Sequence, residues 1–233
     1  MPMVKDIMTF LQQLASNNDK RWFDAHRSQY LDVKAQFEIL TEKLIHGCAQ
    51  FDNRIHDLSV KDCTYRIYRD VRFSSDKSPY KTHMGAYICP QGKKSGYAGY
   101  YFHIGTGGEG YPHGHMLAAG DYRTQPEVIR VLREDIINDN GEIDRIIRQK
   151  VSPLFSIDMD SALKRVPRGF SEDSPWSKYL RLRTFCLCAT PETKFMTADD
   201  VIERSLELFA TTQPFLEYVN RAIEYVYEEE RIK

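Results

Sequence analysis

A segment of seventeen residues, 65–81, concentrates charged and aromatic side chains. It holds five cations, two carboxylates and four aromatic rings, whereas the whole chain of 233 residues has a formal net charge of −1. The pattern predicts a strand over residues 62–73, in which alternate side chains share one face. The side chains on the polar face would be those of Arg66, Tyr68, Asp70 and Arg72. Guanidinium groups donate paired hydrogen bonds to phosphate and carboxylate, so this face favours an anion site.

Seven residues of this segment are expected to contact the anion, which we expect to be a small molecule bearing phosphate or carboxylate. They are Arg66, Tyr68, Arg69, Arg72, Lys77, Tyr80 and Lys81. The same cations could instead form a structural network of ion pairs with Asp70 and Asp76. Exposed ion pairs contribute only about 0–1 kcal/mol each, so stability alone is a weak reason for five cations in one segment. Both interpretations stay open at this point.

Three residues near the predicted sheet are candidates for proton transfer. Asp70 follows Arg69 and lies near Arg72, and cations that close keep a carboxyl group ionised at neutral pH. Asp70 could therefore orient an arginine or act as a base. His83 and His103 are the other candidates, because each is expected to lie beside the basic segment and histidine titrates near neutral pH. The spacing defines no catalytic triad, so whether the chain is an enzyme stays open.

A metal site is a weaker interpretation of the histidines. His103, His113 and His115 could together supply three nitrogen ligands for zinc or another divalent metal. Glu109 is the one carboxylate close to them in the sequence, and no acidic or cysteine partner has the spacing of a known site. The sequence therefore assigns no metal ligands, and it leaves the metal requirement and any cofactor unidentified.

Residues 105–110 spell G-x-G-x-x-G directly after a predicted strand. A dinucleotide site would need a helix to begin at the third glycine, so that its N-terminal amides meet the pyrophosphate. Tyr111, Pro112 and His113 follow instead, and no helix signal appears before Pro126. A flexible loop lying across a site is therefore favoured over a nucleotide fold.

Hydrophobic periodicity places helices at both ends of the chain and groups the strands between them. Helices are predicted over residues 4–15, 19–50, from 126, 142–151, from 200, and 213–230. Strands are predicted over residues 62–73, 83–90, 97–105 and 183–189, with a glycine-rich loop over 105–120. This order favours an α+β fold, a mostly antiparallel sheet of about four to six strands with helices packed on one face. No repeat or linker divides the chain, so residues 1–233 are expected to form a single domain.

Composition places the chain among ordinary globular proteins, because 42% of its residues are hydrophobic and 28% are charged. No apolar run approaches the roughly 18 residues of a membrane span. The amino terminus also lacks the pattern of a secretory signal. We therefore expect no membrane partner and a cytoplasmic location. The five cysteines are odd in number and mostly scattered, which argues against a disulfide framework.

Several motifs along the chain are similar to those of one family. They are NNDKRWF at 17–23, YRIYRDVRF at 65–73, DKSPYKT at 76–82, GYYFHI at 99–104 and LKRVPRGF at 163–170. In these motifs the chain resembles DUF2461, a bacterial and fungal family of proteins of unknown function. The resemblance implies a single cytoplasmic domain and no particular activity, cofactor or catalytic residue. Residues 113–116, His-Gly-His-Met, depart from it, since a glycine-rich run carrying a proline would be expected there.

Two other functions compete with the binding of a small anion. A nucleic-acid-binding module is one, because arginine and tyrosine on strands can contact phosphates and stack on bases. The near-neutral charge and a sequence pI of about 6.7 argue against it. A noncatalytic protein-interaction domain, whose basic face meets an acidic partner, is the other. The sequence does not specify an oligomeric state.

Overall fold

A computed structural model describes residues 2–232, which form nine helices and five strands. The helices are α1 (Pro2–Ser16), α2 (Lys20–Ala25), α3 (Arg27–Cys48), α4 (Val60–Cys63), α5 (Pro126–Asn138), α6 (Glu142–Gln149), α7 (Ser177–Leu180), α8 (Thr193–Met196) and α9 (Val201–Ile232). The strands are β1 (Met84–Ile88), β2 (Gly99–Ile104), β3 (Met116–Asp121), β4 (Ser156–Ile157) and β5 (Phe185–Ala189).

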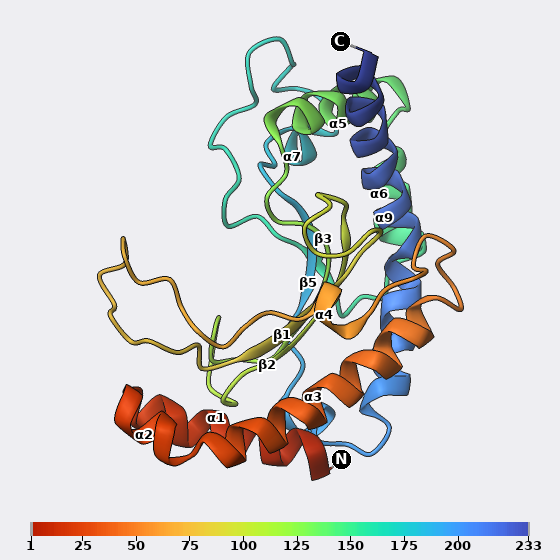
Figure 1. Cartoon of the computed structure of the whole chain (residues 1–233). Coiled ribbons are helices and arrows are strands. Elements are labelled where there is room, and N and C mark those ends of the chain that lie inside the picture. Colours follow the sequence, from red (N-terminus) through yellow and green to blue (C-terminus); the bar gives the residue numbers. More distant parts are fainter. Residues whose placement is uncertain (1, 233) are drawn as a thin grey trace.

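The strands form one antiparallel sheet in the order β1-β2-β3-β5-β4. Helix α1 packs on β2, α3 on β1 and α9 on β3. In Figure 1, the orange-to-yellow loop before β1 projects away from α9, on the far side of the sheet. This arrangement confirms the predicted α+β class, a mostly antiparallel sheet with helices packed on it.

Each strand alternates between two environments, as expected for a sheet with different neighbours on its two faces. The face toward the helices presents Ala86, Ile88, Tyr100, Phe102, Ile104, Leu117, Ala119, Phe185 and Leu187, all buried in the hydrophobic core. The opposite face presents Gly85, Tyr87, Gly99, Tyr101, Ala118, Gly120, Cys186 and Cys188. We call this second surface the open face, because its residues line a cleft and do not pack against a layer of helices.

The first helices follow the predicted apolar stripes, with one interruption. Asp19 caps α2 by accepting the Trp22 N–H at 2.9 Å. The prediction of one helix over residues 19–50 is wrong at His26, where φ of −108° and ψ of 19° separate α2 from α3. The His26 ring stacks on Trp22 at a centroid distance of 4.0 Å and its Nδ1 lies 2.8 Å from the Trp22 carbonyl oxygen. The side chain therefore stabilises the break.

Residues 62–73 were predicted as a strand, and this prediction is wrong. Beyond the end of α4 the segment makes two isolated bridges and no regular ladder. It folds back on itself instead, because the Arg69 N–H donates to the Pro79 carbonyl at 2.9 Å and the Lys81 N–H to the Ile67 carbonyl at 2.8 Å. We call residues 66–80 the basic loop. Since the pairing is local and interrupted, the polar face predicted for this strand does not form.

Strand β3 lies in a stretch predicted as loop, residues 105–120. Its sequence has small residues and no β-branched side chain, so it carries little strand signal. Pairing with β2 on one side and β5 on the other makes it a central strand. A Cβ on Gly120, where φ is +144°, would lie 2.1 Å from the Phe185 carbonyl oxygen, so this close approach requires glycine.

The two helices predicted from 200 and over 213–230 are one continuous helix, α9. It passes through Pro214, which lacks the N–H of a regular helical bond. Burial of apolar residues on both sides, such as Phe209 and Phe215, keeps the helix on the sheet. Buried Asn220 then fixes β2 to α9: its Oδ1 accepts the Ala98 N–H at 2.8 Å and its Nδ2 donates to the Ala98 carbonyl at 3.1 Å.

Candidate ligand-binding cleft

The open face of the sheet carries a cleft of about 480 Å³. Its walls include the tyrosines Tyr65, Tyr87, Tyr101, Tyr111 and Tyr122, and its floor includes Gly85, Gly99, Ala118 and Gly120. Its polar and charged lining consists of Lys81, His83, Arg123, Asp158, Cys186 and Cys188. Cavities of roughly 300–1,000 Å³, mostly apolar with a few polar groups, are typical of small-molecule sites. The cleft therefore has the size and lining for a small ligand.

Glycine in β1 lets a tyrosine ring lie close to the sheet. Gly85 lies on β1 and Tyr101 on the neighbouring strand β2. A Cβ on Gly85 would lie 2.5 Å from the Tyr101 hydroxyl oxygen and 2.9 Å from two ring carbons. The ring can therefore cross this position because Gly85 has no side chain. The absence of a side chain at Gly85 thus positions one wall of the cleft.

Tyr87 is a buried residue of the cleft wall whose hydroxyl is held by backbone carbonyl groups. Its hydroxyl lies 2.7 Å from the Gly120 carbonyl oxygen and 2.9 Å from that of Tyr97, so its single proton is shared between these two acceptors. Burial raises the pKa of Tyr87 well above its usual value, so the hydroxyl remains a donor. The exposed ring of Tyr122 meets Tyr87 edge to face at 6.5 Å. Tyr122 at the rim thus packs against Tyr87, whose hydroxyl is fixed by hydrogen bonds.

The Tyr101 hydroxyl and His103 form a buried hydrogen-bonded pair. Nε2 of His103 lies 3.0 Å from the Pro112 carbonyl oxygen, which can only accept, so Nε2 carries the proton. Nδ1 is then the acceptor for the Tyr101 hydroxyl, also at 3.0 Å. His103 is fully buried, so it meets the cleft only through the lining residues that it contacts, which are Tyr101, His83 and Tyr111. The predicted catalytic candidate is therefore a positioning residue for a tyrosine of the cleft.

His83 lines the cleft and stacks on His103, with the ring centroids 4.6 Å apart. Burial, reinforced by the neighbouring His103, lowers the pKa of His83 to about 3, and burial lowers that of His103 to about 4. Both rings are neutral at pH 7. Nδ1 of His83 has no hydrogen-bond partner among the described residues. His83 therefore offers a neutral imidazole beside the cleft rather than a cationic acid.

Lys81 is a half-buried cation of the cleft wall. Its Nζ donates to the Arg66 carbonyl at 2.9 Å and lies 5.4 Å from the centre of the Tyr65 ring. Within residues 2–232 it has no ion pair with a carboxylate. Burial and the nearby Arg66 guanidinium lower the pKa of Lys81, because both disfavour its charged form. An anion beside Nζ would stabilise that charge.

Arg123 supplies a second cation at the rim. Its guanidinium lies 5.2 Å from the centre of the Tyr122 ring. The Arg123 backbone N–H donates to Oδ1 of Asp121 at 2.9 Å, but no described carboxylate forms an ion pair with its side chain. Arg130 of α5, in contrast, pairs with Glu134 at 3.0 Å. The rim cation thus stays available to a ligand.

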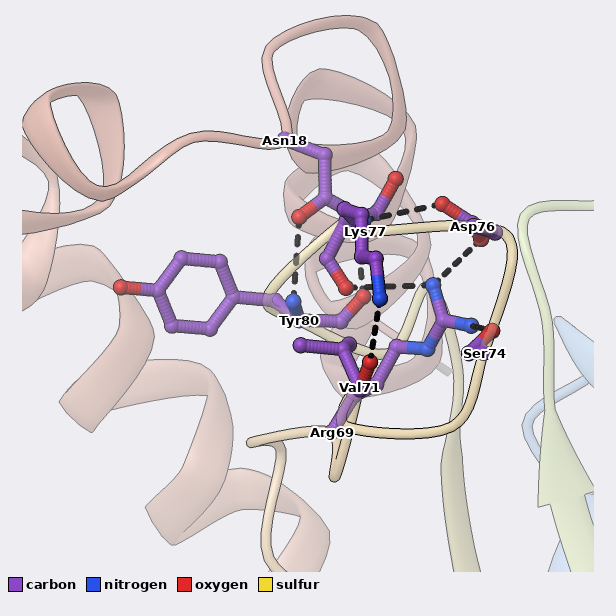
Figure 2. Close-up of polar contacts among 8 residues, drawn as sticks. Asn18, Arg69, Val71, Ser74, Asp76, Lys77 and Tyr80 are labelled. Atoms are coloured by element: carbon purple, nitrogen blue, oxygen red, sulfur yellow. Dashed lines mark hydrogen bonds and ion pairs between the residues drawn. The ribbon is translucent and has the colours of Figure 1, made fainter.

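Arg69, predicted to contact the ligand, is used inside the basic loop. Its guanidinium donates to the Asp76 carboxylate, to the Ser78 carbonyl at 3.1 Å and to the Ser74 hydroxyl at 3.5 Å (Figure 2). Hydrogen bonds from Ser78, reinforced by the one from Arg69, lower the pKa of Asp76 to about 2, so the pair of Arg69 and Asp76 stays charged at neutral pH. The contacts of Arg69 are therefore those of a structural network of ion pairs.

Asp70, Arg72 and Lys77 belong to the exposed part of the basic loop. Nε and one terminal nitrogen of Arg72 donate to Asp70 at 3.0 and 2.7 Å, which lowers the pKa of that carboxyl. Nζ of Lys77 donates to the Val71 carbonyl at 3.1 Å (Figure 2). None of the three lines the cleft. Asp70 therefore pairs with Arg72 outside the cleft.

Tyr68 and Tyr80 anchor the basic loop to the first helices. Buried Tyr80 stacks on Phe23 at a centroid distance of 4.0 Å, and Tyr68 meets Tyr80 at 5.4 Å. Asn18 holds the backbone of Tyr80 through bonds of 2.9 and 3.1 Å, seen at the left of the network in Figure 2. Neither tyrosine lines the cleft. They determine where the loop lies.

The glycine-rich loop contributes one wall residue and no nucleotide motif. The Gly107 N–H donates to the His113 carbonyl at 3.0 Å, and no helix begins within residues 105–115. The bond from His103 to the Pro112 carbonyl docks the loop on the sheet. Tyr111 consequently stands 5.5 Å from both His83 and His103, measured between ring centroids. The loop therefore borders the cleft through Tyr111.

Two of the residues predicted for the site, Lys81 and His83, line the cleft, and His103 lies beneath it. Sequence reasoning missed the wall tyrosines of the open face. A weak signal was present, since Gly85-x-Tyr87 and Gly99-x-Tyr101 alternate small and aromatic residues with a period of two. Among the described residues no cluster of three or more His, Cys, Asp or Glu is arranged to hold a metal ion.

The fold and the cleft define an α+β protein with a tyrosine-lined, cation-edged site on the open face of an antiparallel sheet. The chain belongs to the DUF2461 family, described as a conserved hypothetical protein, whose model matches residues 6–218. No curated protein and no solved structure matches the chain. Within residues 2–232, no helix is both long enough and apolar enough to cross a membrane.

Proposed function

We propose that the cleft binds a small molecule that joins a flat, partly apolar body to a phosphate or carboxylate group. The observation that carries this proposal is the half-buried Lys81, which has no ion pair with a described carboxylate and stands in a wall of tyrosines. A desolvated ammonium of this kind is stabilised most by a ligand of opposite charge.

The tyrosine rings suit the body of such a ligand. Aromatic side chains pack against flat groups, and their hydroxyls keep hydrogen-bonding capacity at the edge. Small residues on the floor, such as Gly99 and Ala118, leave room for the ligand to approach the sheet. The predicted contacts in the basic loop contribute unequally. Arg66 is exposed and beside Lys81, whereas Arg69 holds the loop together.

The proposal is tested by calorimetric titration with phenyl phosphate, benzoate, adenosine 5′-monophosphate and inorganic phosphate. The parent is compared with Lys81→Met, which keeps the apolar stem and removes the charge. A charge-assisted hydrogen bond is worth about 1.5–3 kcal/mol, so Lys81→Met is expected to weaken the best probe by about ten- to a hundredfold. Lys34→Met is the matched control, because Lys34 is an exposed residue of α3 paired with Glu38.

Two results would overturn the proposal. One is the absence of saturable binding for every probe. The other is a folded Lys81→Met variant, verified by its thermal melting, that binds the probes as tightly as the parent.

Single-stranded nucleic acid is a second candidate ligand. It is favoured by the exposed rings of Tyr65, Tyr111 and Tyr122, because bases stack on aromatic side chains beside a basic surface. Binding of a short oligothymidylate would then weaken steeply with salt, since each neutralised phosphate releases counterions. Small-anion binding in a compact cleft is expected to retain most of its affinity over the same range of salt.

A protein-interaction role would use a different surface. Phe73, at the basic loop, is 97% exposed and follows Arg72. Phe73→Ser would abolish copurification of an acidic partner while leaving probe binding in the cleft unchanged. We also infer a cytoplasmic location, supported by five cysteines that are all free thiols, as is usual in a reducing compartment.

A further inference from the structure

A second cavity adjoins the cleft and shares part of its wall. This second chamber has a volume of about 470 Å³. Its residues in common with the cleft are Tyr65, Tyr87, Tyr122 and Arg123. The residues that only the second chamber contributes include Lys93, Lys94, Gly96, Tyr97, Asp121 and Tyr227. The two spaces therefore lie on either side of a common tyrosine wall and together form an elongated site.

The ring of Tyr65 lies near two ammonium groups. Nζ of Lys81 lies 5.4 Å from the ring centre and Nζ of Lys93 lies 6.0 Å from it. Lys81 lines the cleft and does not line the second chamber, whereas Lys93 lines the second chamber and not the cleft. The cleft thus has Lys81 and the second chamber has Lys93, and the ring of Tyr65 lines both spaces.

Positive charge exceeds negative charge along the whole elongated site. The cations are Lys81, Lys93, Lys94 and Arg123, and the carboxylates are Asp121 and Asp158. None of these cations has an ion pair with a described carboxylate. The excess is local, because the chain as a whole has a formal net charge of −1.

Lys93, one of the cations of the second chamber, is held by backbone contacts. The Lys93 N–H donates to the Asp62 carbonyl at 2.9 Å, and its Nζ donates to the Lys61 carbonyl. The turn that carries Lys93 and Lys94 is closed by Gly96, whose φ of +84° brings it against the Tyr227 hydroxyl. The Tyr227 hydroxyl in turn donates to the Ser95 carbonyl at 2.8 Å. The position of Lys93 is therefore determined by the fold.

We propose that the natural ligand carries two anionic groups, one at each end of a flat body. One group binds at Lys81 in the cleft, the second binds at Lys93, Lys94 and Arg123 in the second chamber, and the body crosses the wall of Tyr65 and Tyr122. This inference rests on the proposed function, since it assigns a second anion subsite to the same ligand. A ligand with one anionic group would leave one of the two clusters uncompensated.

The test compares two probes that share one body. Phenyl phosphate and 1,4-phenylene bisphosphate, which carries one phosphate at each end of the same ring, are titrated into the parent, Lys93→Met/Lys94→Met and Lys81→Met. The control is Lys34→Met/Lys43→Met, which removes two charges from exposed positions of α3. The parent is expected to bind the bisphosphate about tenfold tighter or more. Lys93→Met/Lys94→Met is expected to erase this preference and to leave monophosphate affinity within about twofold. Lys81→Met is expected to weaken both probes.

Three outcomes would overturn the inference. If the parent shows no preference for the bisphosphate, or if Lys93→Met/Lys94→Met weakens both probes equally, the second subsite does not exist. In either case monophosphate binding that depends on Lys81 would leave the proposed function standing. If neither probe binds the parent saturably, the proposed function fails together with the inference.

Discussion

The Tyr101 hydroxyl donates a hydrogen bond to Nδ1 of His103 at 3.0 Å, and this bond joins the cleft wall to the interior of the sheet. The opposite nitrogen of His103 donates to the Pro112 carbonyl at the same distance. A single buried imidazole therefore holds both a strand tyrosine and the glycine-rich loop. Its tautomer follows from these partners, because a carbonyl can only accept.

Tyr101→Phe should destabilise the protein although it keeps the ring. The substitution leaves Nδ1 of fully buried His103 without a donor, and an unsatisfied buried acceptor costs about 1–3 kcal/mol. Urea unfolding monitored by circular dichroism measures this loss. Tyr111→Phe is the matched control, since Tyr111 is 65% exposed and its change should stay within about 0.5 kcal/mol. Equal stability of both variants would contradict the tautomer assigned to His103.

Gly85→Ala should act through the ring of Tyr101. The new Cβ would lie 2.5 Å from the Tyr101 hydroxyl oxygen, so the ring must move and lose its bond to His103. We expect a loss of about 1–3 kcal/mol in the parent. In a Tyr101→Ala background the obstacle is gone, and the same substitution should be neutral or slightly stabilising. A double-mutant cycle measures the difference, and additive effects would exclude this coupling.

Stability should fall between about pH 6.5 and pH 4 partly through His83 and His103. Their pKa values in the folded protein are lowered to about 3 and 4, whereas an unfolded histidine titrates near 6.5. In this window the unfolded chain binds protons that the folded protein does not. The free energy of unfolding therefore decreases on acidification, by up to about 1.4 kcal/mol per pH unit for each histidine, and is unaffected by these groups above it.

His83→Gln isolates one of these contributions. Urea unfolding at about pH 7.5 and pH 5 should show a decrease for the variant that is about 1–2 kcal/mol smaller than that of the parent. An identical decrease would mean that His83 titrates normally in the folded protein.

Arg69 and Arg66 should differ although both belong to the basic segment. Arg69→Ala removes the donor to Asp76, Ser74 and the Ser78 carbonyl, so the basic loop should open. Limited proteolysis followed by mass spectrometry should show faster cleavage within residues 66–80. Arg66→Ala, which removes an exposed side chain, should leave the cleavage rate near that of the parent. Equal cleavage of the two variants would refute the structural role of Arg69.

The sequence alone determined the fold class and the family, together with most helices. The apolar stripes of α1 and α3 and the cap at Asp19 are local patterns, because helix geometry repeats over a few residues. Strand β3 was not predicted, because its small residues have little intrinsic strand preference. It exists because β2 and β5 pair with it from both sides.

The residue types of the site were also visible in the sequence, but their grouping was not. Of the residues predicted for the site, Lys81 and His83 line the cleft, whereas Arg69 and Tyr80 make contacts that hold the basic loop. Whether Arg69 binds a ligand or forms an ion pair depends on where Asp76 lies, and the conformation of the basic loop determines that position. Likewise Tyr101 meets Gly85 because the register pairs Gly85 with His103 and Tyr87 with Tyr101, which makes Gly85 a diagonal neighbour of Tyr101 on the open face. Register is set by burial of the opposite face in the core, which is a long-range property, whereas periodicity within one segment reports only which side chains share a face.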